Sequence, residues 1–126
     1  MNNQERLIEV LQASKAWIDH FNFGDVAYCV DRYHPDATLI ASPAGEFRGR
    51  QQIEQFWRPF MTQGATDLIY TQIWLKELDA DTVVLGAHWA MNVGSGIISH
   101  EQWQRNNAGI WQLYRDEFSI LQQQEP

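Results

Sequence analysis

Cysteine is nearly absent from this chain, since Cys29 is the only one among 126 residues. One thiol cannot form an internal disulfide, which favours a reducing compartment, and we expect a cytoplasmic protein. Basic residues are scarce too, with 9 Lys and Arg against 16 Asp and Glu and a formal net charge of −7. This balance argues against nucleic acid and anionic membranes as partners.

Further kinds of signal are missing from the sequence. No apolar run is long enough for a signal peptide or a membrane span, so we expect no membrane partner and no secretion. No His and Cys spacing typical of a zinc site occurs, and we expect neither a metal ion nor a cofactor. Trp, by contrast, is abundant, and its six residues supply much flat apolar surface. The length suits a single domain, residues 1–126, with a core of its own.

Three helices are predicted in the first half of the chain. Apolar residues recur at helical spacing from Leu7 to Phe21, and again from Val26 to Tyr33. Pro35 cannot continue the second helix, and Pro59 is expected to end or kink the third. The predicted helices span residues 1–23, 24–34 and 50–63.

Strands are predicted in the remaining segments. Two short ones fall within residues 37–49, and long antiparallel strands fill residues 67–121. Within the latter, every second residue from Val83 to Val93 is apolar, a period typical of a strand with one buried face. The polar tail 122–126 is expected to fray. The economical α+β arrangement packs three helices on one face of a strongly curved, mostly antiparallel sheet, with a pocket between the layers.

The order of these signals between Gly24 and Trp57 resembles the nuclear-transport-factor-2-like superfamily. A short helix stops at His34-Pro35-Asp36, a strand and a turn follow, and a further helix carries Trp57. Residues 111–118 look like the last strand of that family, so the resemblance covers nearly the whole chain. Branches of the superfamily include ketosteroid isomerase and polyketide cyclases. The resemblance implies a cone-shaped, cystatin-like fold.

Turn positions predict which residues face each other across the long strands. A hairpin turn centred on Ser95 places Trp89 opposite Glu101. A second turn, near residue 108, places Glu101 opposite Asp116. Together with the apolar period of residues 83–93, these registers put one set of side chains on the inner face: Leu85, Trp89, Met91, Ser99, Glu101, Trp103, Tyr114, Asp116 and Phe118.

Two carboxyl groups face each other in this set, those of Glu101 and Asp116. Burial beside Trp and Met would raise both pKa values, and mutual repulsion would make them titrate as a pair. Such a pair can hold a proton at neutral pH and act as a general acid, so both are candidate catalytic residues. The alternative is that Arg48, Arg105 or Arg115 neutralises one carboxylate, or that the outer edge of the sheet leaves both in water.

Flat and apolar side chains surround this pair in the predicted arrangement, and two neutral hydroxyl groups lie nearby. This is the composition expected of a pocket for a planar, apolar ligand with one polar end. The candidate ligand-binding residues are Trp17, Trp57, Trp89, Met91, Ser99, Trp103, Tyr114 and Phe118.

The family resemblance implies a catalytic role for only part of this set. Matching strands places Glu101 where ketosteroid isomerase has the protonated Asp of its oxyanion site. The place of that enzyme's general base holds Ala41 or Ser42, and neither can act as a base. Trp17 matches its oxyanion-binding Tyr and keeps an N–H donor. Ketosteroid isomerisation itself is therefore not expected, and any catalysis must use Asp116, Glu101 or both.

Three functions remain open from the sequence. The first is a cofactor-free proton-transfer enzyme, of isomerase, cyclase or dehydratase type, acting on a small hydrophobic carbonyl compound. The second is a pocket that binds or carries such a compound without catalysis, and the third is a dimeric assembly domain. The resemblance implies a homodimer packed through the outer sheet face. The predicted registers place apolar residues there that would otherwise be exposed: Val84, Ile98, Trp111 and Leu113.

Overall fold

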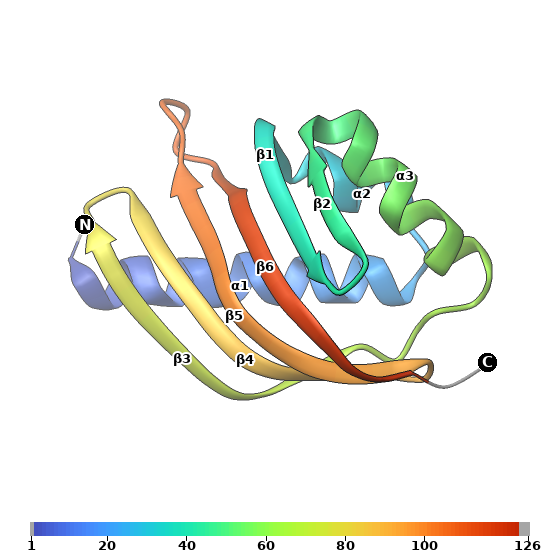
Figure 1. The fold of residues 1–126 in the computed structure, drawn as a ribbon. Helices are drawn as coiled ribbons and strands as arrows, with labels where there is room; N and C mark the ends of the chain where they lie inside the picture. Colours follow the sequence, from blue (N-terminus) through green and yellow to red (C-terminus); the bar gives the residue numbers. More distant parts are fainter. Residues whose placement is uncertain (1, 124–126) are drawn as a thin grey trace.

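Three helices and six strands make up residues 2–123, the part of the chain that the computed structural model describes (Figure 1). The helices are α1 (Asn3–Asn22), α2 (Val26–Asp31) and α3 (Gly49–Thr62). The strands are β1 (Tyr33–Ser42), β2 (Gly45–Arg48), β3 (Ile69–Asp79), β4 (Thr82–Met91), β5 (Gly94–Arg105) and β6 (Trp111–Gln123). The expected α+β class is confirmed. Of the tail predicted to fray, residues 122 and 123 belong to β6 and 124–126 lie outside the described residues.

The six strands form one curved sheet in the order β2-β1-β6-β5-β4-β3. Only β1 and β6 pair in parallel within this sheet of residues 33–123, and the other neighbouring strands are antiparallel. Figure 1 shows α1 running behind the sheet, with α2 and α3 beside β1 and β2. The apolar faces of helices and sheet bury a common core, whose fully buried members include Val10, Phe21, Tyr33, Leu39 and Ile53. None of the helices within residues 2–123 combines the length and the apolar character needed to cross a membrane.

Helix α2 is shorter than the sequence predicts. Asp25 caps its first turn, because its carboxylate accepts a hydrogen bond from the Tyr28 backbone N–H. The helix ends at Asp31, and Tyr33 and His34 lie in β1 instead. The reason is Pro35, since a residue that precedes proline avoids the helical conformation. The early strand start directs Tyr33 into the core, where it is fully buried.

Helix α3 (Gly49–Thr62) agrees with the predicted span of residues 50–63, and it continues through Pro59 rather than ending there. The helix runs to Thr62. A proline removes one backbone hydrogen bond, and in the last turn few bonds remain for it to break. The buried side of α3 carries Ile53, Phe56, Trp57 and Met61.

The β4–β5 hairpin turns at residues 92 and 93, earlier than predicted. Leu85 is therefore the residue opposite Glu101, and Trp89 lies opposite Gly96. Gly96 favoured a turn in the sequence, but it lies within β5 because β6 passes too close for a side chain. A Cβ added there would clash with the Ser119 carbonyl oxygen. The residue opposite Glu101 is thus four positions from the predicted one. Because four is an even number, Glu101 still points to the predicted inner face of the sheet.

Two bulges change the side-chain directions that a regular ladder would give. In β5 the register shifts between residues 98 and 100, and Ser99 is exposed. In β6 it shifts beside Tyr114, whose exposed fraction is 38%. The predicted inner positions of Ser99 and Tyr114 are therefore wrong, because an extra residue in one strand reverses the alternation. Ile98 and Leu113 point inward in their place.

The apolar residues predicted on the outer face are buried. Ile98, Trp111 and Leu113 belong to the core between sheet and helices, and Val84 is also buried. The bulges account for Ile98 and Leu113, while the Trp111 indole N–H reaches α1 and donates to Glu9 Oε1 at 2.7 Å. The predicted outer-face positions of Ile98, Trp111 and Leu113 are therefore wrong, whereas strand alternation keeps Val84 on the outer face. By strand alternation, the outer face exposes other large apolar side chains, those of Ile69, Trp74 and Ile97.

Candidate active site

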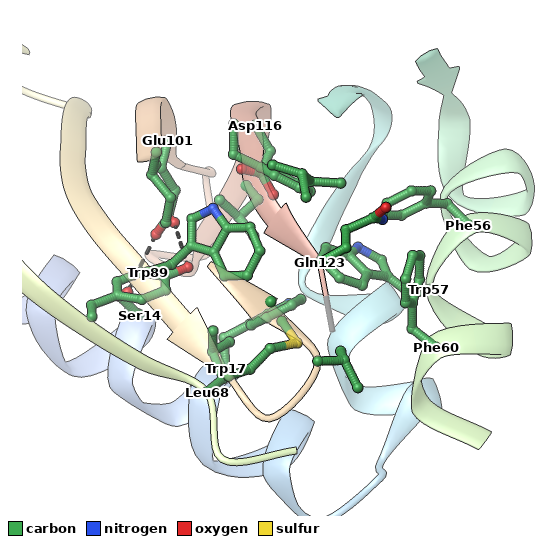
Figure 2. Close-up of a pocket in the computed structure, with 18 residues that line it drawn as sticks. Ser14, Trp17, Phe56, Trp57, Phe60, Leu68, Trp89, Glu101, Asp116 and Gln123 are labelled. Carbon is green, nitrogen blue, oxygen red and sulfur yellow. Dashed lines mark hydrogen bonds between the residues drawn. The ribbon is translucent and has the colours of Figure 1, made fainter. Parts of the chain in front are cut away.

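A cavity lies between the inner face of the sheet and the helices (Figure 2). Its walls come from α1, α3, β3 to β6 and the adjoining loops. Four polar side chains contribute to one part of the wall: Ser14, Tyr70, Glu101 and Asp116. Apart from Gln123, the remaining side chains of the wall are aromatic or aliphatic.

Most of the residues predicted for the site line this cavity. They are Trp17, Trp57, Trp89, Met91, Glu101, Asp116 and Phe118. Trp103 does not line it, and lies fully buried behind the wall, where it supports Glu101. Ser99 and Tyr114 lie outside, on the exposed side of the sheet. The roles of the lining residues in binding or catalysis stay predictions.

Glu101 is 2% exposed and accepts hydrogen bonds from three neutral donors. The Trp103 indole N–H donates to Oε1 at 2.8 Å, and the Ser14 hydroxyl donates to the same oxygen at 3.3 Å. The Tyr70 hydroxyl donates to Oε2 at 2.9 Å. Figure 2 shows Ser14 and Glu101 pointing toward each other from α1 and β5. Three elements thus converge on one carboxyl group.

Asp116 lies opposite Glu101 on the neighbouring strand, which confirms the predicted pairing. It is 6% exposed, and the Tyr33 hydroxyl donates to its Oδ2 at 2.7 Å. The Trp57 indole N–H in turn donates to the Tyr33 oxygen at 3.1 Å. Tyr33 comes from the start of β1 and Trp57 from α3. The parallel pairing of β1 with β6 places this hydroxyl beside Asp116.

Both carboxyl groups have raised pKa values. Burial raises the pKa of Glu101 to about 8, the negative charge of Asp116 adds to this, and the three hydrogen bonds oppose it. Burial also raises the pKa of Asp116 to about 6, against the lowering effect of the Tyr33 hydrogen bond. The two groups face each other on neighbouring strands, so they titrate as a pair, and burial favours a state in which the pair keeps a proton.

The arginines that could have neutralised this pair have other partners. Arg48 contacts Glu46 at 3.4 Å, Arg105 contacts Asp81 at 2.8 Å, and Arg115 contacts Glu117 at 2.6 Å. Within residues 2–123, no ion pair includes Glu101 or Asp116. The alternative of an Arg-paired carboxylate is therefore not what the structure shows.

Aromatic rings form the apolar part of the wall. Trp57 stacks on Phe118 with ring centroids 5.8 Å apart, and Trp89 meets Phe118 edge-on at 6.1 Å. Two indole N–H groups of the wall have acceptors in the backbone. Trp17 donates to the Cys29 carbonyl and Trp89 to the Ser119 carbonyl, both at 3.1 Å. The Trp17 N–H, which matches an oxyanion donor in the resemblance, therefore already has an acceptor within the protein. These rings present flat apolar surface.

Three residues of the site were not predicted from the sequence. Ser14 was visible as a polar residue within the apolar stripe of the first helix, which is a signal of a buried polar role. The predicted second helix includes Tyr33, although His34 precedes a proline and therefore favours an extended conformation. Tyr70 gave no signal, because its direction depends on a bulge in β3 between residues 71 and 74.

No group of three or more His, Cys, Asp and Glu side chains within residues 2–123 is arranged to hold a metal ion. Cys29 is fully buried, and burial raises the pKa of its thiol to about 12. A thiol in that state is not a nucleophile at neutral pH. The carboxyl and hydroxyl groups of the described cavity wall are those of Glu101, Asp116, Ser14 and Tyr70.

The chain belongs to the SnoaL-like domain family, whose sequence model matches residues 14–117. This family is part of the nuclear-transport-factor-2-like superfamily, as the resemblance implied. It includes isomerases, cyclases and dehydratases. None of the curated proteins compared with the chain matches it.

Solved structures share the fold over nearly the whole chain. A protein of Novosphingobium aromaticivorans, provisionally assigned as a scytalone dehydratase, superposes with a TM-score of 0.82 at 10% identity, covering 95% of this chain and 87% of its own. A ketosteroid isomerase-like protein of Erwinia carotovora gives 0.77 at 16% identity, with 97% and 99% covered. ActVI-ORFA of Streptomyces coelicolor gives 0.76 at 13% identity, with 91% and 97% covered. Other similar structures are described as having a cystatin-like fold. At these identities the likeness shows the fold alone.

Proposed function

We propose that this protein is a cofactor-free proton-transfer enzyme, of isomerase, cyclase or dehydratase type, acting on a small hydrophobic carbonyl compound. One observation carries the proposal: two buried carboxyl groups on neighbouring strands have pKa values raised to about 6 and about 8, on either side of neutrality. An acid and a base of this kind, facing one cavity, are what proton transfer at neutral pH requires. The range of activities within the family agrees with this chemistry.

The two groups take different roles in the proposed reaction. Asp116, the stronger acid, is mostly ionised at pH 7 and removes a proton from the carbon next to the carbonyl group. Glu101 is mostly protonated and supplies a proton on the side of the carbonyl oxygen. The developing negative charge on that oxygen is then stabilised by this proton within a mostly apolar wall.

The apolar wall and the charge of the site define the proposed ligand. Trp57, Trp89 and Phe118 offer flat surface to a planar molecule, and the polar end of the cavity receives its oxygen. Because no ion pair within residues 2–123 includes Asp116, the site disfavours a ligand that brings a second negative charge. A neutral ketone is therefore preferred to its carboxylate-bearing analogue.

Deuterium exchange into a planar ketone tests the proposal. In heavy water the protein is expected to speed exchange at the acidic carbon of 2-tetralone, as followed by proton NMR. The exchange rate, plotted against pH, is expected to give a bell-shaped curve with midpoints at pH about 6 and about 8. The reason is that activity needs ionised Asp116 and protonated Glu101. A tetralone that carries a carboxylate is the matched control, and it should exchange more slowly.

The competing function is a binding protein without catalysis. It would be supported if 2-tetralone or related ketones bind, and bound ketone exchanges no faster than ketone in buffer at any pH from 5 to 9. An exchange rate that rises steadily with pH, as it does in buffer, would also contradict the proposed acid and base.

A homodimer through the outer sheet face is proposed as well. Its support is that Ile69, Trp74 and Ile97 are 56%, 48% and 38% exposed on that face, where a lone chain would leave apolar surface in water. Light scattering at micromolar concentration is expected to give twice the mass of the chain, and Ile97→Glu is expected to give the monomer. Leu11→Glu, on the exposed side of α1, is a control that should leave the mass unchanged. A monomeric wild type would contradict the proposal.

A cytoplasmic location is also proposed, because a single cysteine favours a reducing compartment.

A further inference from the structure

Each carboxyl group of the site accepts a hydrogen bond from one tyrosine. Tyr33 donates to Asp116 Oδ2 at 2.7 Å, and Tyr70 donates to Glu101 Oε2 at 2.9 Å. The two contacts look alike, but their surroundings differ. A further donor, Trp57, binds the tyrosine oxygen in the first contact, whereas Trp103 binds the carboxyl group in the second. That difference fixes the direction of one hydrogen bond and leaves the other free to reverse.

The bond between Tyr33 and Asp116 has a fixed direction. The Trp57 indole N–H lies 3.1 Å from the Tyr33 oxygen, and an indole N–H can only donate. Tyr33 must therefore accept from Trp57 and turn its own hydrogen to Asp116. If Asp116 Oδ2 carried a proton, the Tyr33 hydrogen would lose its acceptor in a fully buried position, which is costly. The arrangement keeps Oδ2 as an acceptor, which favours the ionised form of Asp116 and leaves Oδ1 as the oxygen that can take up a proton.

The bond between Tyr70 and Glu101 has no such constraint on Oε2. The Trp103 N–H donates to Oε1 at 2.8 Å, so this oxygen must remain an acceptor. A proton on Glu101 therefore resides on Oε2, the oxygen that Tyr70 contacts. In that state Oε2–H donates to the Tyr70 oxygen, and the Tyr70 hydrogen is released. Because Tyr70 lines the cavity and Tyr33 does not, the released hydrogen can point to a ligand.

We propose that Tyr70 is the catalytic residue that delivers the proton of Glu101 to the substrate oxygen, and that Tyr33 is a positioning residue that keeps Asp116 a base. This inference rests on the proposed function and names the groups that act in it. In the balanced step, Asp116 Oδ1 takes the proton from carbon, and the C–H electron pair moves toward the carbonyl group. Tyr70 gives its proton to the carbonyl oxygen and takes the proton from Glu101 Oε2. The products are the enol, protonated Asp116 and ionised Glu101.

Binding of an enol mimic tests the role of Tyr70 without turnover. 2-Naphthol has the shape of the enol of 2-tetralone, and its fluorescence reports binding. At pH 7, Tyr70→Phe is expected to weaken 2-naphthol binding at least tenfold, because the hydroxyl that contacts its oxygen is gone. Tyr114→Phe, outside the cavity, is the matched control and should bind as the wild type does. Equal affinity in Tyr70→Phe and the wild type would overturn the assignment.

Kinetics with 2-tetralone separates the two tyrosines. Tyr70→Phe is expected to lower kcat by about 10²- to 10³-fold with little change in KM. Tyr33→Phe is expected to move the acidic limb of the pH profile above pH 6, since the Tyr33 hydrogen bond lowers the pKa of Asp116. An unmoved acidic limb in a folded Tyr33→Phe protein would overturn the positioning role.

Failure of the proposed function leaves a different pattern. If the wild type exchanges no ketone while 2-naphthol binding still depends on Tyr70, the enzyme proposal fails and Tyr70 stands as the donor to a ligand oxygen. If exchange occurs and Tyr70→Phe retains it with an unchanged profile, the enzyme proposal stands and the inference about Tyr70 fails.

Discussion

Replacing Asp116 by Asn is expected to lower the rate of ketone deuterium exchange by about 10²- to 10⁴-fold at pH 7, the usual contribution of a general base. The introduced amide oxygen can still accept the hydrogen bond from Tyr33, so the buried contact and the fold are retained. An amide cannot take up the proton from carbon. Proton NMR on 2-tetralone, with circular dichroism as the check of folding, measures the effect.

The control for this variant is Asp19→Asn, which makes the same chemical change on the exposed side of α1, where Asp19 pairs with Lys15. Its exchange rate is expected to equal that of the wild type. A folded Asp116→Asn protein with wild-type exchange would exclude Asp116 as the base and leave Glu101 as the only carboxyl group of the described cavity wall.

Replacing Glu101 by Gln is expected to stabilise the protein at high pH. In the unfolded chain Glu101 ionises near its ordinary pKa of 4.5, whereas in the folded protein it holds its proton up to about pH 8. Between these values the folded state binds more protons, so the free energy of unfolding falls as pH rises. The loss through Glu101 between pH 5 and 9 is roughly 3–5 kcal/mol. Gln imitates the protonated form and removes this loss.

Urea unfolding at pH 5 and pH 9 measures this effect. The wild type is expected to lose stability over that range, and Glu101→Gln to lose much less, while the two proteins are similar at pH 5. Glu46→Gln on the exposed strand β2 is the control, and its curve should follow that of the wild type. If Glu101→Gln is less stable than the wild type at pH 9, the fold favours the ionised carboxyl group, and the raised pKa of Glu101 is contradicted.

The pairing of Glu101 with Asp116 could be predicted from the sequence because the turn near residue 108 lies where its Asn and Gly residues indicate. The position of the β4–β5 turn could not be predicted, because glycine occurs both in turns and where two strands pass too close for a side chain. Gly96 is required by the close approach of the Ser119 carbonyl in the neighbouring strand, a contact between residues far apart in the chain. The face of Glu101 was nevertheless correct, since the error was an even number of residues.

Bulges explain the site residues that were placed wrongly. Nothing local in the sequence marks the extra residue beside Ser99 or beside Tyr114, and each bulge arises from how the strand fits both its neighbours. The hydrogen bonds that Asp116 and Tyr33 accept could not be predicted for a related reason. Tyr33, Trp57 and Asp116 come from three separate elements, and their contact depends on the parallel pairing of β1 with β6.

Titration of the two carboxyl groups by carbon-13 NMR tests most directly whether the cavity holds an acid and a base at neutral pH. Protein labelled at the side-chain carboxyl carbons of Asp and Glu would be titrated from pH 3 to 10, with Asp116→Asn and Glu101→Gln assigning the signals. We expect midpoints near pH 6 for Asp116 and near pH 8 for Glu101. Midpoints near pH 4 for both groups would show two ordinary carboxylates and would contradict the proposed acid and base.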